Sequence, residues 1–179
     1  DYNRVLADKL SNVYLYNGVE LVKYDVNGAK KSWYSNKMNG SIRCVDVTNP
    51  FKILVLHKDF NKLVILNDKL DVLNEGMDLL NMRLYCVDAV CFSQDNNIWL
   101  YEERDNELVK IDNNGNVIYQ TGNLISHSLS NINPLLMKER GDGIYVLKGD
   151  RTGIIVFDNY GNYRYTILKE DLRTISLSG

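Results

Sequence analysis

Short apolar runs, separated by clusters of Asn, Asp and Gly, follow one another along the whole chain. Residues 53–56 and 63–66 are purely aliphatic, while "NIWLYEE" and "GIYVLKG" mix β-branched and aromatic residues with polar ones. Few segments show the 3.6-residue apolar period of an amphipathic helix. Runs of this kind, bounded by turn-forming residues, are typical of strands. The pattern therefore predicts an all-β protein.

One short motif recurs four times, each time as an apolar strand that ends in Asp or Asn. The copies are "VKYDVNGA", "VILNDKLD", "VKIDNNGN" and "IVFDNYGN". Aligned on their polar residues, Asp25, Asn67, Asp112 and Asp158, they are spaced by 42, 45 and 46 residues. A second strand precedes each copy and a third follows it, and a further apolar segment leads in, clearest in "SIRCVDVT" and "LYCVDAVCF".

Four strands per repeat, at a period in the low forties, predict the blades of a β-propeller. A blade has two apolar faces and must stack on its neighbours to cover them. A β-sandwich also has many short strands, but it has no reason to repeat its turn chemistry at near-constant spacing. We predict one propeller domain over 1–179, with repeats at about 1–36, 37–80, 81–124 and 125–170.

The number of blades stays open between four and five. Residues 171–179 resemble the first strand of a further blade. That strand either joins the blade begun by residues 1–10, or it belongs to a fifth blade. We favour five blades, of which this chain supplies most.

Composition narrows the class of protein. The chain of 179 residues has 21 basic and 23 acidic residues and a net charge of −2, with no basic block. Nucleic-acid binding is disfavoured, because phosphate neutralisation needs a basic surface. No apolar run approaches the roughly 20 residues of a membrane-spanning helix. The first residues do not resemble a signal peptide, so we expect either a cytoplasmic protein or a mature chain after signal cleavage.

The loop from Asp112 to Asn116 has two interpretations. Its carboxylate and amide oxygens are suited to calcium, but a helix-loop-helix site needs Glu at its twelfth position, where this chain has Asn123. Asn-Gly between apolar strands instead favours a hairpin with a type I′ turn, in which both central residues have positive φ. We favour the turn.

The cysteine pattern supplies the candidate metal ligands. "CVDV" from Cys44 and "CVDA" from Cys86 are one repeat apart, which would place Asp46 and Asp88 at matching positions on the strands that line a propeller channel. The two carboxylates are weak candidates to bind a cation, and the alternative is that they accept backbone hydrogen bonds. Cys86 and Cys91 are not expected to pair, since residues five apart in a strand face opposite sides.

Catalytic signals are weak. His57 and His127 lie in different repeats, and neither is near a recurring acid or nucleophile. No nucleophile elbow, phosphate loop, dinucleotide fingerprint or zinc spacing occurs. We therefore predict that the protein is not an enzyme and uses no cofactor.

Aromatic residues are the remaining candidates for binding, because Tyr and Trp suit half-wet interfaces. The alternative is that they pack between blades. The candidates for partner binding cluster in the first and fourth repeats and are Tyr14, Tyr16, Trp33, Tyr34, Tyr160 and Tyr163.

Residues 49–70, "NPFKILVLHKDFNKLVILNDKL", and residues 95–112, "DNNIWLYEERDNELVKID", resemble a family of small exported propeller-like proteins of Bacteroidota. The resemblance covers about 10–168. It implies a periplasmic or lipid-anchored protein whose signal peptide has been cleaved, and a link to the plug subunit of the type IX secretion translocon. It implies no catalytic residue.

Together these observations predict a non-enzymatic propeller scaffold with protein partners, part of an outer-membrane complex but not itself spanning the membrane. A carbohydrate- or peptide-binding module is the first alternative. A metal-dependent hydrolase or lyase using Asp46 and Asp88 is the second.

Overall fold

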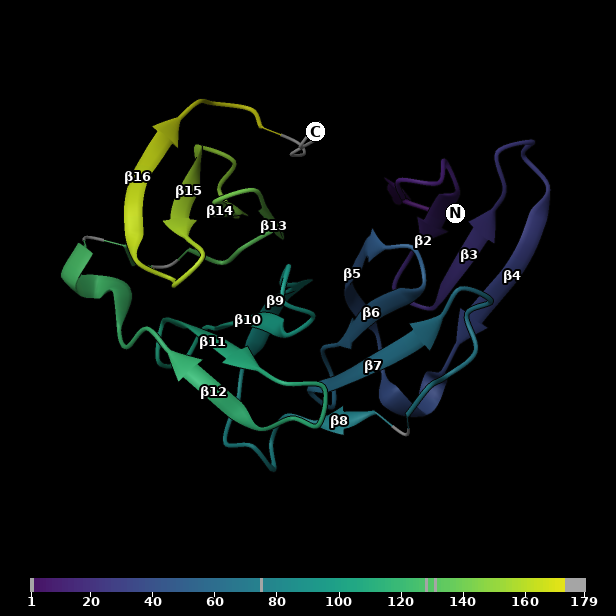
Figure 1. The fold of residues 1–179 in the computed structure, drawn as a ribbon, viewed down its shortest axis with the longest axis horizontal. Coiled ribbons are helices and arrows are strands. Elements are labelled where there is room, and N and C mark those ends of the chain that lie inside the picture. The colour runs from purple at the N-terminus through teal and green to yellow at the C-terminus, as the bar shows by residue number, and fades with distance from the viewer. Residues whose placement is uncertain (1, 75, 128, 131, 173–179) are drawn as a thin grey trace. The chain divides into compact units, whose positions relative to one another are not determined.

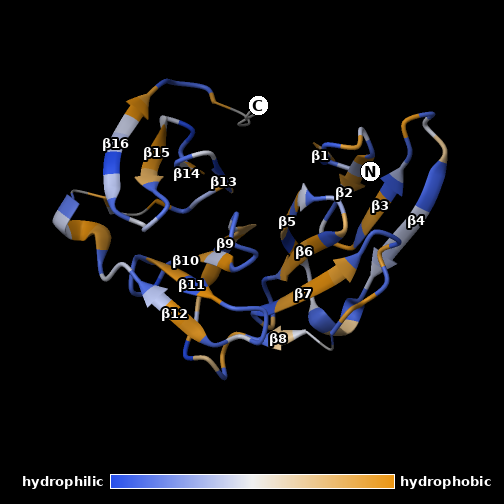
Figure 2. Ribbon diagram, in the orientation of Figure 1, coloured by the Kyte–Doolittle hydropathy of each residue, from blue (hydrophilic) through white to orange (hydrophobic). Residues whose placement is uncertain are grey.

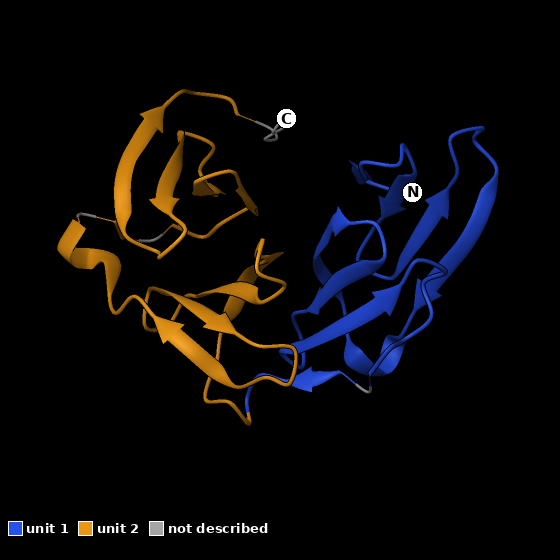
Figure 3. Ribbon diagram, in the orientation of Figure 1, with its two compact units in different colours: residues 1–80 blue, residues 81–179 orange. Residues whose placement is uncertain are grey.

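The computed structural model describes residues 2–74, 76–127, 129–130 and 132–172 (Figure 1). They form two compact units, residues 1–80 and 81–179 (Figure 3). The predicted further strand over 171–179 lies largely outside the described residues.

The first unit consists of two four-stranded antiparallel sheets with the strand orders β1-β2-β3-β4 and β5-β6-β7-β8. The short strand β8 pairs with β7 through Met77 and Asp78. The strands are β1 (Arg4–Ala7), β2 (Val13–Tyr16), β3 (Glu20–Tyr24), β4 (Lys30–Ser35), β5 (Ile42–Asn49), β6 (Lys52–His57), β7 (Lys62–Asn67) and β8 (Met77–Asp78).

The second unit has the same construction, with the strand orders β9-β10-β11-β12 and β13-β14-β15-β16. Its strands are β9 (Val87–Phe92), β10 (Ile98–Glu102), β11 (Glu107–Ile111), β12 (Val117–Gln120), β13 (Leu136–Arg140), β14 (Gly143–Leu147), β15 (Gly153–Asp158) and β16 (Tyr163–Leu168). Each of the four sheets falls within one predicted repeat. The predicted all-β class and four-stranded repeat are confirmed.

Among the described residues, two short 3₁₀ helices, η1 (Lys37–Asn39) and η2 (Leu124–His127), lie between strands. Within the described ranges, no helix is long and apolar enough to cross a membrane.

The central strands of the sheets carry most of the core, and the edge strands β4, β12 and β16 are mostly exposed, whereas the edge strand β9 is buried along its whole length. Every residue of β10 is buried, whereas every residue of β12 is exposed. Figure 2 shows the same contrast between the hydrophobic strand β7 and the more hydrophilic strand β4. This distribution follows from sheets that are covered on both faces at their centres.

Within each unit, the two sheets share one core. In the first unit, Tyr14, Leu21 and Tyr34 pack with Val55 and Val64 of the following sheet. In the second unit, Trp99, Tyr101 and Leu108 of one sheet pack with residues of the next, among them Ile144, Ile155 and Phe157.

The recurring polar residue closes the hairpin between the third and fourth strands of every sheet. At Asp112, the side-chain Oδ1 accepts the backbone N–H groups of Asn114 and Asn116, both at 2.8 Å. The backbone N–H of Gly115 donates to the carbonyl of Asp112 at 3.1 Å. Asp25, Asn67 and Asp158 make the same pair of side-chain bonds to residues two and four positions on. The hairpin interpretation is confirmed.

The predicted type I′ geometry of these turns is wrong. Only one residue of each turn has positive φ, namely Gly28, Leu70, Gly115 and Gly161. Asn27 and Asn114 are not among the positive-φ residues. The physical reason is the side-chain oxygen of the first turn residue. It accepts the backbone N–H of the residue two positions later and keeps the two central residues in the right-handed region of φ/ψ space. The result is a type I turn followed by a left-handed bulge residue, and the strand register shifts beside three of these turns.

This turn predicts the outcome of changing its acceptor. Asp112→Ala removes the oxygen that accepts two backbone N–H groups, and we expect a loss of about 1 kcal/mol in the free energy of unfolding. Asp112→Asn should cost less, because it keeps the Oδ1 acceptor, as Asn67 does in the second sheet, and loses only the bond from the Asn116 amide to Oδ2. Urea denaturation of the three proteins measures this. Equal losses of unfolding free energy for Asp112→Ala and Asp112→Asn would show that the carboxylate charge, and not the Oδ1 acceptor, stabilises this turn.

Candidate functional site

The side-chain oxygens of Asp112 accept hydrogen bonds from residues of its own hairpin turn. Besides the two backbone groups at Oδ1, Oδ2 accepts the side-chain amide of Asn116 at 2.8 Å. These bonds, first those from Asn116, lower the pKa of Asp112. The loop satisfies its own oxygens, which supports the turn interpretation over calcium binding.

Asp46 and Asp88, the sequence-predicted cation ligands, belong to different units. Asp46 is buried on β5, where its Oδ1 accepts the backbone N–H of Thr48 at 3.0 Å and the hydroxyl of Thr48 at 2.5 Å. Accepting a backbone hydrogen bond is the role that was the alternative to metal binding. Asp88 is buried on β9 in the second unit.

Asp88 has two neighbours that offer ligand atoms. In the part of the chain that the structure describes, Cys86, Asp88 and Glu103 form the one group whose ligand atoms all lie within 4.8 Å of one another. The thiol of Cys86 donates to Oε2 of Glu103 at 3.1 Å. A thiolate with two carboxylates is a donor set that Zn²⁺ accepts. We call these three residues the thiol–carboxylate cluster.

Sequence reasoning did not identify Glu103, because its proximity depends on strand register. The backbone N–H of Glu103 donates to the carbonyl of Cys86 at 2.8 Å, which pairs the two residues across the β9–β10 hairpin. The sequence did contain one signal for this pair, the β9–β10 hairpin. Two strands that pair outward from the turn at 93–97 place residue 86 opposite residue 103, once the register shift near Glu102 is allowed for.

A further carboxylate beside this cluster, that of Glu102, has a structural role. Glu102 is buried, and its carboxylate accepts the backbone N–H groups of Tyr85, Cys86 and Asp105. Burial, followed by the charges of Glu103 and Asp88, raises the pKa of the Tyr101 phenol well above its usual range. A small pocket of about 180 Å³ adjoins these groups, lined by Tyr101, Glu103, Arg104, Asn106, Asn123, Ile125 and Ser130.

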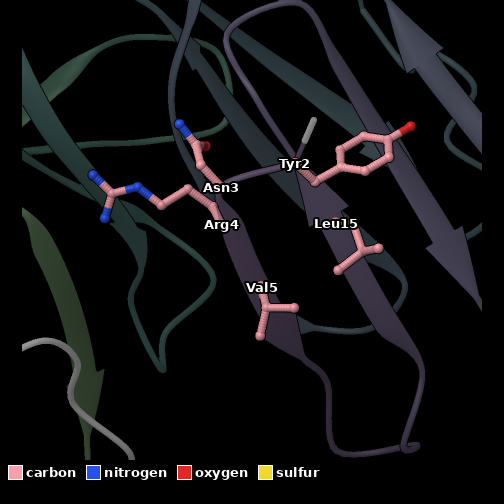
Figure 4. Close-up of a pocket in the computed structure, with 5 residues that line it drawn as sticks. All are labelled: Tyr2, Asn3, Arg4, Val5 and Leu15. Carbon is pink, nitrogen blue, oxygen red and sulfur yellow. The ribbon is translucent and has the colours of Figure 1, made fainter.

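A larger, open depression of about 580 Å³ lies on the first unit. Its lining residues are Tyr2, Asn3, Arg4, Val5 and Leu15 (Figure 4). Val5 on β1 and Leu15 on β2 are direct cross-strand partners. Tyr2 Oη donates to Glu20 at 2.8 Å. The depression is therefore an apolar sheet face with a polar rim.

The predicted aromatic candidates divide by burial. Tyr14, Tyr16 and Tyr34 are core residues of the first unit, at most 6% exposed, which corrects their assignment to a partner-binding surface. Tyr163 is partly buried against the core of the second unit. Trp33 and Tyr160 are 60% and 75% exposed. Alternation along a strand predicts that Tyr14 and Tyr16 share a face, but not that this face is the covered one.

His57 forms a buried polar link in the first unit. Its Nδ1 lies 2.9 Å from the carbonyl of Gly40, and its Nε2 lies 3.0 Å from the hydroxyl of Tyr34. A carbonyl only accepts, so Nδ1 carries the proton and Nε2 accepts from Tyr34. Burial lowers the pKa of His57, and it opposes the smaller raising effect of the Gly40 bond. The neutral ring joins the segment around Gly40 to β4 and β6.

Comparison with known proteins identifies the type of fold. No family model matches the chain, and no curated protein is significantly similar to it in sequence. Among solved structures, a protein of unknown function from Bacteroides caccae is 12% identical, with a TM-score of 0.67 over 99% of this chain and 64% of that one. Virginiamycin B lyase from Staphylococcus aureus is 10% identical, with a TM-score of 0.65 over 96% and 56%. The Pan2 WD40 domain of Neurospora crassa is 9% identical, with a TM-score of 0.66 over 93% and 49%.

These likenesses define a β-propeller-type fold, which confirms the predicted fold class. The chain spans between about half and two thirds of the length of the structures just named. At these identities the likeness shows the fold alone.

The His57 link predicts a pH-dependent stability. The unfolded state binds a proton at His57 below a pKa of about 6.5, whereas the folded state, with its lowered pKa, resists it. The free energy of unfolding should therefore fall as the pH drops below about 6.5. Tyr34→Phe leaves Nε2 unsatisfied and should cost about 1–3 kcal/mol at pH 7.5.

Urea denaturation between pH 7.5 and 5 measures both effects. The matched control is Tyr160→Phe, in which an exposed hydroxyl is removed. A Tyr34→Phe protein as stable as this control would show that the bond to His57 contributes nothing.

Proposed function

We propose that the protein is a non-enzymatic propeller scaffold that binds other proteins in the cell envelope, as a subunit of an outer-membrane complex such as the type IX secretion translocon, in a plug-like role. We place it in the periplasm or at the outer membrane. The sequence resemblance to exported Bacteroidota proteins supports this location, and the likeness to the Bacteroides caccae structure supports the propeller-type fold of the scaffold.

The observation that carries the proposal is a set of three adjacent loops in the first unit. Each exposes one large apolar side chain: Val19 is 55% exposed, Met38 88% and Phe60 54%. We call these three residues the apolar loop surface. Met and aromatic residues are enriched at protein interfaces, and exposed apolar groups gathered on neighbouring loops mark binding sites.

Hydrogen bonds hold the three loops together. The backbone N–H of Ile42 donates to the carbonyl of Gly18 at 3.0 Å. The backbone N–H and hydroxyl of Ser41 donate to the carboxylate of Asp59 at 2.7 and 2.9 Å. These bonds lower the pKa of Asp59.

Glycine is required beside this contact. Gly40 has a φ of +79°, and a Cβ there would lie 2.5 Å from Cβ of Asp59. A fixed set of loops on a rigid frame is suited to recognition, because little order has to be gained on binding.

Partner capture tests the proposal. The tagged protein, incubated with detergent-solubilised native membranes, should recover a stoichiometric outer-membrane partner that mass spectrometry identifies. Met38→Glu combined with Phe60→Glu should abolish the recovery, because two charges would have to be buried at the contact. Phe51→Glu is the matched control, since Phe51 is 64% exposed in a turn at the opposite end of the sheet.

Two results would contradict the proposal. One is elution of the protein alone in every detergent and salt concentration. The other is full recovery of the partner by the double variant.

A second candidate function is metal-dependent chemistry at the thiol–carboxylate cluster, favoured by the convergence of Cys86, Asp88 and Glu103. Under this candidate, elemental analysis of protein purified with a thiol reductant should find one divalent cation per chain. Cys86→Ala should release it, and Cys91→Ala, which changes a buried cysteine outside the cluster, should not. A metal content that is zero, or equal in both variants, removes this candidate. The sugar- or peptide-binding alternative stays a prediction.

A further inference from the structure

The small pocket of the second unit, which we call the Tyr101 pocket, has a fixed polar floor. Two buried lining residues form this floor, Tyr101 at 1% exposure and Asn106 at 8%. The Tyr101 hydroxyl donates to Oδ1 of Asn106 at 2.7 Å, and Nδ2 of Asn106 donates to the carbonyl of Leu129, also at 2.7 Å. The Asn106 carbonyl accepts the backbone N–H of Leu124 at 2.9 Å. Asn106 therefore joins the β10–β11 turn to η2 and to the segment after it, which gives the pocket a preformed shape.

Two opposite charges line this pocket. Glu103 and Arg104 are consecutive residues of the β10–β11 turn, and both belong to the lining. Among the ion pairs of the described residues, none joins Glu103 to Arg104. The guanidinium of Arg104 instead lies over the ring of Tyr85, 4.6 Å from its centroid, and Oε2 of Glu103 accepts the thiol of Cys86 at 3.1 Å. These contacts position both charged groups without neutralising either of them.

The charges around the pocket exclude a simple anion as its ligand. Residues 101–107, "YEERDNE", contain four acidic residues and one basic residue. Asp88 on β9 adds a further carboxylate, whose ligand oxygen lies within 4.8 Å of that of Glu103. An anion that approached Arg104 would be repelled by these carboxylates, because like charges interact strongly at short range in a partly buried site. A ligand of Arg104 must therefore carry a positive group as well.

The size of the pocket and its aliphatic lining residue restrict the ligand further. The volume of about 180 Å³ is below the roughly 300–1,000 Å³ that is typical of pockets for drug-sized ligands. Ile125 of η2 lines the pocket and is 60% exposed. Its backbone N–H donates to Oδ1 of Asn123, a second lining residue, at 2.8 Å. The pocket thus suits a small molecule that has two opposite charges and a short aliphatic chain.

We propose that the Tyr101 pocket binds a small aliphatic α-amino acid, with its ammonium group at Glu103, its carboxylate at Arg104 and its side chain against Ile125. An α-amino acid carries both charges on one carbon atom, so it complements both charged residues at once. The guanidinium can receive the carboxylate through two parallel N–H···O bonds. A simple amine would leave Arg104 without a ligand group, and a simple carboxylate would leave Glu103 without one.

This inference goes beyond the proposed scaffold function. The Tyr101 pocket belongs to the second unit, whereas the apolar loop surface belongs to the first. Partner capture and amino-acid binding can therefore succeed or fail independently of each other.

Calorimetric titration with L-valine is the first test, in a buffer that contains EDTA and a thiol reductant. We expect saturable binding at one site per chain. Two probes of matched shape, 3-methylbutanoate without the ammonium group and isobutylamine without the carboxylate, should each bind at least about tenfold more weakly, because each loses one charge-assisted contact. Absence of saturable binding by L-valine, or equal affinity for the three probes, would overturn the proposal.

The EDTA separates this site from the thiol–carboxylate cluster, which shares Glu103. Binding in its presence shows that the ligand needs no metal ion. Binding that appears only after Zn²⁺ replaces the EDTA would mean that a metal ion, and not Arg104, holds the carboxylate, and it would overturn the proposal.

Substitutions test the two charged contacts separately. Glu103→Gln and Arg104→Gln should each raise the dissociation constant for L-valine at least about tenfold. Glu103→Gln should not weaken 3-methylbutanoate, and Arg104→Gln should not weaken isobutylamine, a pattern that general damage to the fold would not produce. Glu20→Gln on β3 and Arg164→Gln on β16 are the matched controls. Unchanged affinity for L-valine in both pocket variants would contradict the assignment.

Two-dimensional NMR locates the site without a substitution. Saturation with L-valine should shift the backbone amide signals of residues 103–106 and 123–125, because both segments line the pocket. Shifts confined to other parts of the chain would place the binding elsewhere and overturn the proposal.

Discussion

The constraint on which this structure depends is that its sheets are apolar on both faces. Strand β6 is buried at all but its first residue, and β10 along its whole length, so the sheets to which they belong cannot stand alone. Two-stranded hairpins in water are marginal, and burial contributes roughly 25 cal/mol for each Å² of apolar surface removed from water. Stability therefore comes from stacking one sheet on the next, and the local turns and strand pairs serve to present flat apolar faces for it.

Lysines at one position of the repeat show how polar groups are fitted into this stacking. Two residues before the corner, Lys23 extends over the ring of Tyr14 and donates to the carbonyl of Asp68 in the next sheet, at 2.7 Å. Lys110, at the matching position, extends over Trp99 and binds Asp95 at 2.6 Å. In both places the aliphatic stem and the cation–π contact allow a charge to lie beside a core. Burial would raise the pKa of Asp95, but hydrogen bonds, first from Lys110, lower it to about 2.

The sequence was sufficient for features that depend on neighbouring residues. Alternation and turn chemistry predicted the strands, and the spacing of Asp25, Asn67, Asp112 and Asp158 predicted the four-stranded repeat. Features that depend on register or on the choice of face were not accessible. Glu103 lies beside Cys86 because of cross-strand pairing, and Tyr14 is buried because one of two equally apolar faces is covered. The turn type was missed because an Asn-Gly pair suits two geometries, and the side chain of the residue before it decides between them.

The hairpin turns at the recurring Asp or Asn, whose hydrogen bonds are all local, have a consequence for how the chain folds. Each closes between residues four positions apart, as from Asp112 to Asn116, and uses only its own side chain and backbone. Such contacts cost little loop-closure entropy, and the strands that they join are consecutive in sequence, so contact order within a sheet is low. Folding can then start at any of these hairpin turns and spread to the adjacent sheet. During synthesis, one hairpin can form while the next is still being made.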